Sequence, residues 1–160
     1  MFKDKKILIT AGPTIEKIDP VRYISNFSSG KQGYAFARAF SKLGAQVHLV
    51  SGPTNLAVPE GVILHKVESV EGMLNACYEC LPADIAICAA AVCDYRPKEI
   101  YQQKMKKEQD IDEISLTLVK NPDILAQISN HKNRPNLVIG FAAETENLIE
   151  NAKSKLKRKN

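Results

Sequence analysis

The sequence predicts an α/β protein with a doubly wound, mostly parallel sheet and helices on both faces. Short apolar runs alternate along the chain with segments of helical periodicity, which is the pattern of parallel strands joined by crossover helices. Several of the runs are nearly continuous in apolar residues, as expected for strands that are buried on both sides. The length of 160 residues is that of one domain, so we expect residues 1–160 to form a single folding unit.

The first strand is expected over Lys6–Thr10, where the run KILIT ends at a Gly-Pro-Thr turn. A loop over Pro13–Ser29 then precedes a helix over Gly30–Leu43, in which apolar residues recur at helical spacing. Ser28 or Ser29 can cap the first amides of this helix.

The rest of the chain continues the alternation, and a second Gly-Pro-Thr turn follows the second strand. We expect strands over Gln46–Val50, Val62–Val67, Ala83–Val92, Ile114–Leu118 and Leu137–Ala142, and helices over Val70–Leu81, from Asn121 onward and over Glu146–Asn160. Asn121 is predicted to cap its helix, with Pro122 at the first helical position. Ligands of such folds bind beyond the carboxyl ends of the strands, so functional residues are expected in the segments that follow them.

Composition excludes several classes of protein. The contents of 44% hydrophobic and 25% charged residues exclude a disordered tail or a fibrous repeat. No run approaches the about 18 apolar residues of a membrane span, and no signal-peptide pattern opens the chain, so we expect a cytoplasmic protein with no membrane partner. The net charge of +4 is mild and is concentrated in two lysine-rich segments, which suits small anionic ligands better than nucleic acid.

The cysteines and histidines form no recognisable metal or redox motif. Cys77 and Cys80 make a C-x-x-C pair, but no second pair follows at the spacing of a zinc ribbon. The pair also falls late in its expected helix, unlike a thioredoxin-type pair. We interpret the cysteines as reduced thiols, and we assign no role to His48, His65 or His131.

The start of the Gly30–Leu43 helix is a candidate phosphate site. Ser28, Ser29 and Gly30 offer hydroxyls and backbone amides at a helix N-terminus, where anions bind readily. The segment is neither a Walker A loop nor a G-x-G-x-x-G loop. Ordinary capping explains the same residues equally well.

Two further segments carry candidate binding groups. The small residues Ala89, Ala90 and Ala91 let backbone amides approach a ligand, or they simply pack tightly in a central strand. Asp94 is harder to explain by packing, because an ionised carboxylate needs partners. The lysine cluster that begins at Lys104 is either a solvated loop or a source of one ammonium group for a phosphate.

Seven separated segments carry a family resemblance: ITAGPT, DPVRYISN, SSGK, AAAVCDYRP, KMKK, KNPDIL and GFAAET, in this order. Together they resemble phosphopantothenoylcysteine synthetase, the phosphopantothenate–cysteine ligase of coenzyme A synthesis. In many bacteria this domain is the C-terminal half of a bifunctional flavoprotein. The resemblance covers the chain from about Lys5 to Asn160 and implies a Rossmann-like fold, a homodimer, and the use of CTP and Mg²⁺.

The resemblance also implies a two-step reaction. The carboxylate of 4′-phosphopantothenate reacts with CTP to give an acyl-cytidylate and pyrophosphate, and the amine of L-cysteine then displaces CMP. Asn26 would contact the acyl group, Lys104 would be the catalytic lysine on a flexible loop, and Arg22 would reach across the dimer interface. With the helix-start residues included, the expected nucleotide- and substrate-binding positions are Ser28, Gly30, Ala89, Ala90, Ala91, Asp94, Pro122, Asp123, Ile124, Leu125, Phe141, Lys155 and Lys159; the metal ligands are left open.

The sequence departs from the family pattern in two ways. Cys93 stands where the family often has alanine. The family also continues past the position of Asn160 with a further strand and a C-terminal helix, so we expect a synthetase domain truncated at its C-terminus, whose own activity stays open. A flavin-binding decarboxylase half is an expected fused or associated partner, and FMN would belong to that half.

Two alternatives to the ligase are an oxidoreductase and a non-catalytic module. An NAD(P)-dependent oxidoreductase is disfavoured, because the first turn lacks the glycine fingerprint and no acid follows the second strand to hold a ribose. A non-catalytic binding or assembly module would dimerise and bind CTP without releasing pyrophosphate.

Overall fold

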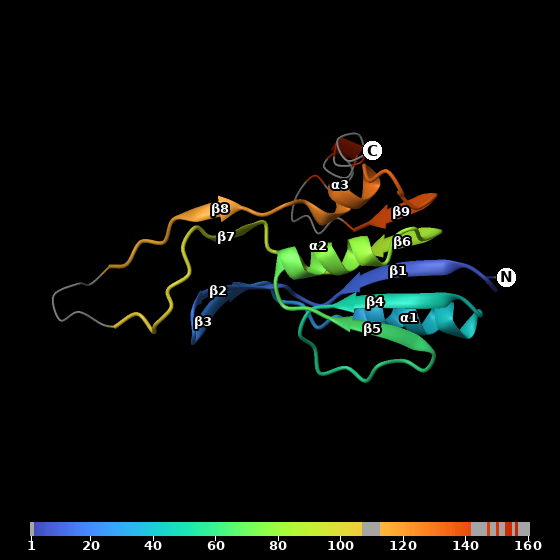
Figure 1. Cartoon of the computed structure of the whole chain (residues 1–160), viewed down its shortest axis with the longest axis horizontal. Helices are drawn as coiled ribbons and strands as arrows, with labels where there is room; N and C mark the ends of the chain where they lie inside the picture. Colours follow the sequence, from blue (N-terminus) through green and yellow to red (C-terminus); the bar gives the residue numbers. More distant parts are fainter. Residues whose placement is uncertain are drawn as a thin grey trace.

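The computed structural model describes residues 2–106 and 113–141, together with residues 147, 150, 153, 154 and 156. Five parallel strands form the central sheet in the order β5-β4-β1-β6-β9 (Figure 1). These strands are β1 (Lys6–Ala11), β4 (Gln46–Ser51), β5 (Val62–Lys66), β6 (Ile85–Cys88) and β9 (Leu137–Gly140). The predicted doubly wound α/β fold is confirmed. Within the described ranges, no helix combines the length and the apolar character needed to cross a membrane.

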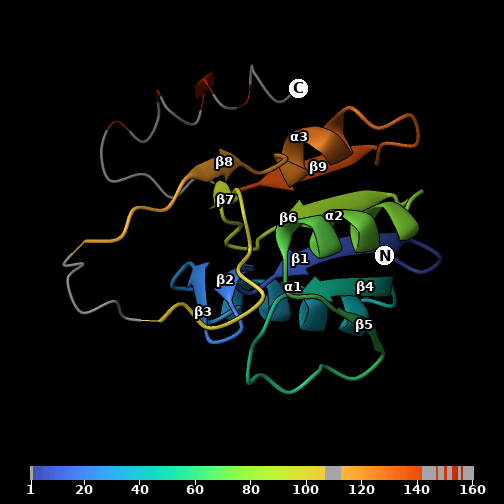
Figure 2. The ribbon, with the colours of Figure 1, turned by 60° about the vertical axis from the view of Figure 1, so that its left-hand side comes forward.

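Helices cover both faces of the sheet (Figures 1 and 2). One face carries α1 (Lys31–Lys42), and the other carries α2 (Val70–Glu79) and α3 (Ile124–Ser129). Side chains of β1 alternate between the two layers, because successive residues of a strand point to opposite faces. Ile7 and Ile9 are buried against the α1 side, whereas Leu8 is buried among residues of α2 and α3.

The start of α3 differs from the prediction. The helix begins at Ile124, and its N-cap is Asp123, whose side chain accepts a hydrogen bond from the amide of Ala126 at 3.1 Å. Asn121 was expected to cap the helix, but its buried amide group donates instead to the carbonyl oxygen of Cys93 at 2.9 Å. A tertiary contact therefore moves the helix start two residues along the chain.

The start of α1 lies close to the predicted position, but its cap differs. Gly30 is the N-cap, in the left-handed region at φ 74°, and no side chain caps the helix. Ser28 and Ser29 make shorter local turns instead, in which their hydroxyls accept from the amides of Gly30 at 3.3 Å and Lys31 at 3.5 Å. A side chain at position 30 would come within 2.7 Å of the methyl group of Thr54, so both backbone and packing favour glycine.

Two antiparallel ribbons extend beyond the carboxyl ends of the sheet strands (Figure 1). The expected Pro13–Ser29 loop contains the first ribbon, β2 (Ile15–Asp19) paired with β3 (Arg22–Ser25). The second pairs β7 (Tyr95–Pro97) with β8 (Leu118–Lys120), so the strand expected over Ile114–Leu118 begins only at Leu118.

Two other expected elements are shorter than predicted or lie largely outside the described residues. The strand predicted over Ala83–Val92 ends at Cys88, because the chain then turns toward the end of β1. The final helix, predicted over Glu146–Asn160, falls largely outside the described residues.

Candidate active site at the carboxyl edge of the sheet

A cleft of about 600 Å³ opens at the carboxyl ends of β6 and β9, beside the start of α3. Seven of the predicted site residues line it: Ala90, Asp94, Pro122, Asp123, Ile124, Leu125 and Phe141. The other residues of its wall are Thr10, Cys88, Val92, Cys93, Lys120, Asn121 and Ala126, which sequence analysis did not assign to the site. Positions after β6 and before α3 thus come together although some 30 residues separate them in the sequence.

The position of the cleft follows from the strand order. The chain runs from β1 to β4 on one side, whereas β6 lies on the other side of β1. Crossover connections therefore leave the carboxyl ends of β1 and β6 in opposite directions, and such a switch point leaves a crevice. The general rule for doubly wound sheets could have identified Thr10, which lies one residue before the end of β1 and beside Cys88 in the register, as a further wall residue.

Hydrogen bonds across the mouth of the cleft fix its rim. Asn121 donates from its backbone amide to the carbonyl oxygen of Asp94 at 2.8 Å. The guanidinium of Arg96 donates to Oδ1 of Asn121 at 2.9 Å and to the carbonyl oxygen of Lys120 at 3.2 Å. These bonds join the segment after β6 to the segment before α3, while the carboxylate of Asp94 stays exposed.

The segment from Ala89 to Ala91 differs from the expectation in one respect. Its amides already have partners at the end of β1 and just beyond it: Ala89 donates to the carbonyl oxygen of Thr10 and Ala90 to the Thr10 hydroxyl, both at 3.2 Å. Ala91 donates to the carbonyl oxygen of Gly12 at 2.9 Å. The backbone amides are therefore engaged within the protein, and what Ala90 presents to the cleft is a small side chain.

Asn26 lies beside this segment. Its Nδ2 donates to the carbonyl oxygen of Ala91 at 3.2 Å, and the side chain is exposed. The loop before α1, which also carries Ser28 and Gly30, is thereby connected to the segment after β6. The structure thus places Asn26 at the same carboxyl edge as the cleft, although it is not part of the cleft wall.

Arg22 and Lys104 belong to a different group, at the turn of the β2–β3 ribbon. Asp19 is buried there and accepts from the amides of Val21 at 2.8 Å, Arg22 at 2.9 Å and Met105 at 3.2 Å. The Arg22 guanidinium lies 3.3 Å from the Asp19 carboxylate and donates to the carbonyl oxygen of Met105 at 3.1 Å. Lys104, next to Met105, is exposed.

Asp19 holds the segment that carries Lys104 against the ribbon, and its electrostatics match that role. Burial alone would raise the pKa of this carboxyl, but hydrogen bonds from the Val21 and Met105 amides, together with the Arg22 charge, hold the pKa below its usual range. Sequence analysis missed Asp19, although an aspartate before Pro20 at a turn is a recognisable signal.

Two of the predicted nucleotide-binding residues, Lys155 and Lys159, lie outside the described residues. Burial raises the pKa of the Cys93 thiol, so this residue is a neutral wall group and not an activated nucleophile.

Comparison with known proteins agrees with the sequence motifs. The chain is 53% identical over 160 residues to the coenzyme A biosynthesis bifunctional protein CoaBC of Vibrio vulnificus strain YJ016, an alignment that covers 99% of this chain and 40% of the relative. The CoaBC protein of Haemophilus influenzae is 51% identical over 155 residues, covering 96% of this chain and 38% of that protein. The chain therefore spans about 40% of the length of the relative from Vibrio vulnificus.

Solved structures show the same fold. The crystal structure of the C-terminal domain of a CoaBC bifunctional protein superposes with a TM-score of 0.86 at 47% identity, covering 99% of this chain and 74% of that one. The DNA/pantothenate metabolism flavoprotein from Streptococcus pneumoniae gives a TM-score of 0.77 at 27% identity, covering 96% and 78%. Residues 2–160 match the family of the DNA/pantothenate metabolism flavoprotein C-terminal domain, and the chain belongs to that family.

Proposed function

We propose that this chain is a phosphopantothenate–cysteine ligase domain, which joins 4′-phosphopantothenate and L-cysteine at the expense of CTP. The main support for this function is that seven predicted binding residues line one cleft at the carboxyl edge of the sheet, in a chain whose relatives are named for coenzyme A biosynthesis. A volume of about 600 Å³ is within the usual range of small-molecule sites.

In the first step, a carboxylate oxygen of 4′-phosphopantothenate attacks the α-phosphorus of CTP and pyrophosphate leaves. Both reactants are anions, so the protein must hold them together against their repulsion. We assign the nucleotide to the cleft wall formed by Pro122–Leu125 and Phe141. The exposed Lys104 supplies a cation to the phosphates.

Mg²⁺ is an expected participant, and the cleft fits it. Mg²⁺ is usually held by one or two carboxylates together with substrate phosphates and water, and Asp94 and Asp123 both line the cleft. When bound, the ion would neutralise charge on the triphosphate. Asp123 also caps α3 through the Ala126 amide, so Asp94 is the first choice as a ligand.

In the second step, the amine of L-cysteine attacks the acyl carbon, an amide bond forms, and CMP and a proton leave. Negative charge develops on the acyl oxygen, and a neutral hydrogen-bond donor stabilises it. The Nδ2 of Asn26 carries two hydrogens. Asn26 donates one of them to the carbonyl oxygen of Ala91, and it would donate the other in a hydrogen bond to the acyl oxygen.

We further propose a homodimer, in which the ribbons of two copies meet. Large apolar side chains are exposed on or beside both ribbons: Val21, Tyr23, Phe27, Tyr95, Leu116 and Leu118. Such a concentration of apolar surface is typical of an interface. A second copy is the proposed occupant, and Arg22, at the turn of the β2–β3 ribbon, is then placed to reach the partner's site.

The test is pyrophosphate release from CTP, Mg²⁺ and 4′-phosphopantothenate, measured before and after addition of L-cysteine, with CTP and NADH binding followed by calorimetry. The ligase predicts CTP binding, pyrophosphate release and a cysteine-dependent amide product. CTP binding without pyrophosphate release would identify a binding module instead. Binding of NADH but not CTP would identify an oxidoreductase.

A further inference from the structure

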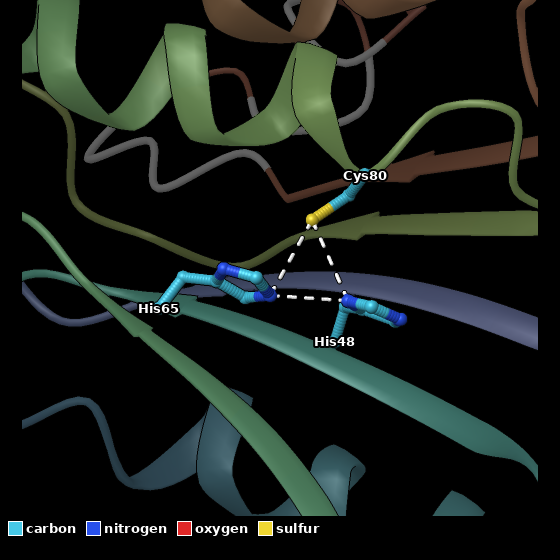
Figure 3. A group of neighbouring side chains, drawn as sticks. All are labelled: His48, His65 and Cys80. Carbon is cyan, nitrogen blue, oxygen red and sulfur yellow. Dashed lines mark hydrogen bonds between the residues drawn. The ribbon is translucent and has the colours of Figure 1, made fainter.

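Three side chains with metal-ligating atoms meet on the β4–β5 half of the sheet, on the opposite side of β1 from the cleft (Figure 3). His48 comes from β4, His65 from β5, and Cys80 is the C-cap of α2. Nδ1 of His48 lies 3.0 Å from Nε2 of His65. The Cys80 sulfur lies 3.7 Å from the His48 nitrogen and 3.6 Å from the His65 nitrogen.

The fold brings these residues together through the strand register and the end of a helix. In the β4–β5 pairing, His48 lies beside Ile63 and His65 beside Val50. The two histidines are thus on the same face of the sheet, two positions apart, and their rings stack with centroids 5.3 Å apart. The end of α2 then places the Cys80 sulfur opposite the two neighbouring ring nitrogens, so that the three atoms form a triangle, as Figure 3 shows.

The spacing of the three ligand atoms matches a tetrahedral zinc site. Zinc–nitrogen distances of about 2.0–2.1 Å and a zinc–sulfur distance of about 2.3 Å place two nitrogens about 3.3–3.4 Å apart and a nitrogen and a sulfur about 3.5–3.6 Å apart. The observed separations are 3.0, 3.6 and 3.7 Å. An ion therefore fits with side-chain movements of a few tenths of an ångström.

The site is largely enclosed by the protein, with His48 and His65 half-buried. Cys80 is buried, and Nε2 of His48 has no hydrogen-bond partner among the residues that the structure describes.

We propose that Nδ1 of His48, Nε2 of His65 and Sγ of Cys80 bind one Zn²⁺ ion, with water at the fourth position. Two imidazoles and one thiolate are ligands typical of Zn²⁺, whereas Mg²⁺ prefers oxygen. The site is therefore chemically separate from the magnesium of the proposed reaction. The ion joins two strands of the sheet to the end of α2, so it stabilises the folded state, to which it binds selectively. Binding displaces the thiol proton to solvent.

The test is titration of the purified protein with Co²⁺ as an optical probe, and with Zn²⁺ in competition with a chromophoric chelator. We expect one equivalent of Co²⁺ to give a sulfur-to-cobalt charge-transfer band and the intense visible bands of a tetrahedral site. Zn²⁺ should raise the thermal unfolding midpoint. The variants Cys80→Ser and His65→Asn should each weaken Zn²⁺ binding by more than about 100-fold, beyond the usual cost of losing a hydrogen-bond partner of a ligand.

Matched controls separate this site from other thiols and imidazoles. Cys93→Ala and His131→Asn remove the same groups elsewhere and should leave the cobalt spectrum unchanged. If circular dichroism shows that Cys80→Ser does not fold, the test relies on His65→Asn, because His65 is only half-buried and its substitution should disturb the fold less. The proposal is overturned if wild-type protein gives no charge-transfer band, which would leave a hydrogen-bonded triad only. It is also overturned if the band persists in a folded His65→Asn or Cys80→Ser protein. None of these readouts depends on ligase activity.

Discussion

Asn26 donates a hydrogen bond to the carbonyl oxygen of Ala91 across 3.2 Å, between residues that are 65 positions apart in the sequence. The bond joins the loop before α1 to the segment after β6. It therefore holds an exposed amide group at a fixed place on the carboxyl edge of the sheet, where pre-positioned donors act most effectively on developing charge.

We expect Asn26→Asp to impair cysteine addition more than acyl-cytidylate formation. The substitution preserves size, but it removes the donor to Ala91 and places a negative charge beside the acyl oxygen. Amide-bond formation should fall by about 10²–10³-fold, the usual effect of losing one such donor, while pyrophosphate release persists. The two half-reactions are measured separately, with Asn133→Asp on an exposed loop as the matched control. Equal slowing of both steps, or of neither, would remove Asn26 from the proposed role.

Lys104→Gln should slow pyrophosphate release severely and leave the fold intact. Lys104 is exposed, so its loss should not change the circular dichroism spectrum or the thermal midpoint. The rate of the first step should fall by about 10²–10³-fold, because one charged contact to the phosphates is lost. Lys106→Gln, two residues along and also exposed, is the control and should retain activity. Near-wild-type pyrophosphate release in Lys104→Gln would contradict the assignment.

The sheet and its helices were predictable because local patterns specify them. Apolar runs such as KILIT and helical periodicity depend only on neighbouring residues. The β2–β3 ribbon could also have been predicted from the sequence, because β-branched and aromatic residues flank the Asp19-Pro20 turn. The sequence analysis nevertheless predicted this segment as a loop.

Features that depend on tertiary contacts could not be predicted in this way. Asn121 has the sequence signature of a helix cap, but its amide bonds to Cys93, which is 28 residues away. The His48, His65 and Cys80 cluster likewise needs the register of two strands and the end of α2. Ala90 and Asp94 were singled out from their residue types at the end of a strand, whereas the other predicted cleft residues, from Pro122 to Leu125 and Phe141, were named only from a family resemblance.

Tyr23→Glu should convert a dimer into a monomer. Tyr23 is 58% exposed on the β2–β3 ribbon, and a buried charge without a partner would oppose association. Ile63→Glu is the matched control, because Ile63 is 43% exposed on β5, at the other edge of the molecule. Light scattering coupled to size exclusion should give a dimer for the wild type and for Ile63→Glu. A monomeric wild type in the presence of CTP would contradict the proposed dimer, and a dimeric Tyr23→Glu would move the interface away from the ribbon.

The last prediction concerns pH and Asp19. The folded-state pKa of this carboxyl lies below its usual value of 3.8, because hydrogen bonds from the Val21 and Met105 amides and the Arg22 charge outweigh the opposing effect of burial. A carboxylate with a lowered folded-state pKa stabilises the fold above its unfolded-state pKa, and this contribution is lost as the pH falls through the folded-state value.

Asp19→Asn should therefore unfold at a lower temperature than wild type near neutral pH. This gap between the two unfolding temperatures should narrow as the pH falls below about 4. Thermal melts at a series of pH values measure the gap, with the exposed Glu60→Gln expected to show none. The same substitution turns an amide hydrogen toward the Met105 amide, which loosens the segment that carries Lys104, so pyrophosphate release should also fall near neutral pH. A gap that stays constant with pH would show that Asp19 acts through its shape and not through its charge.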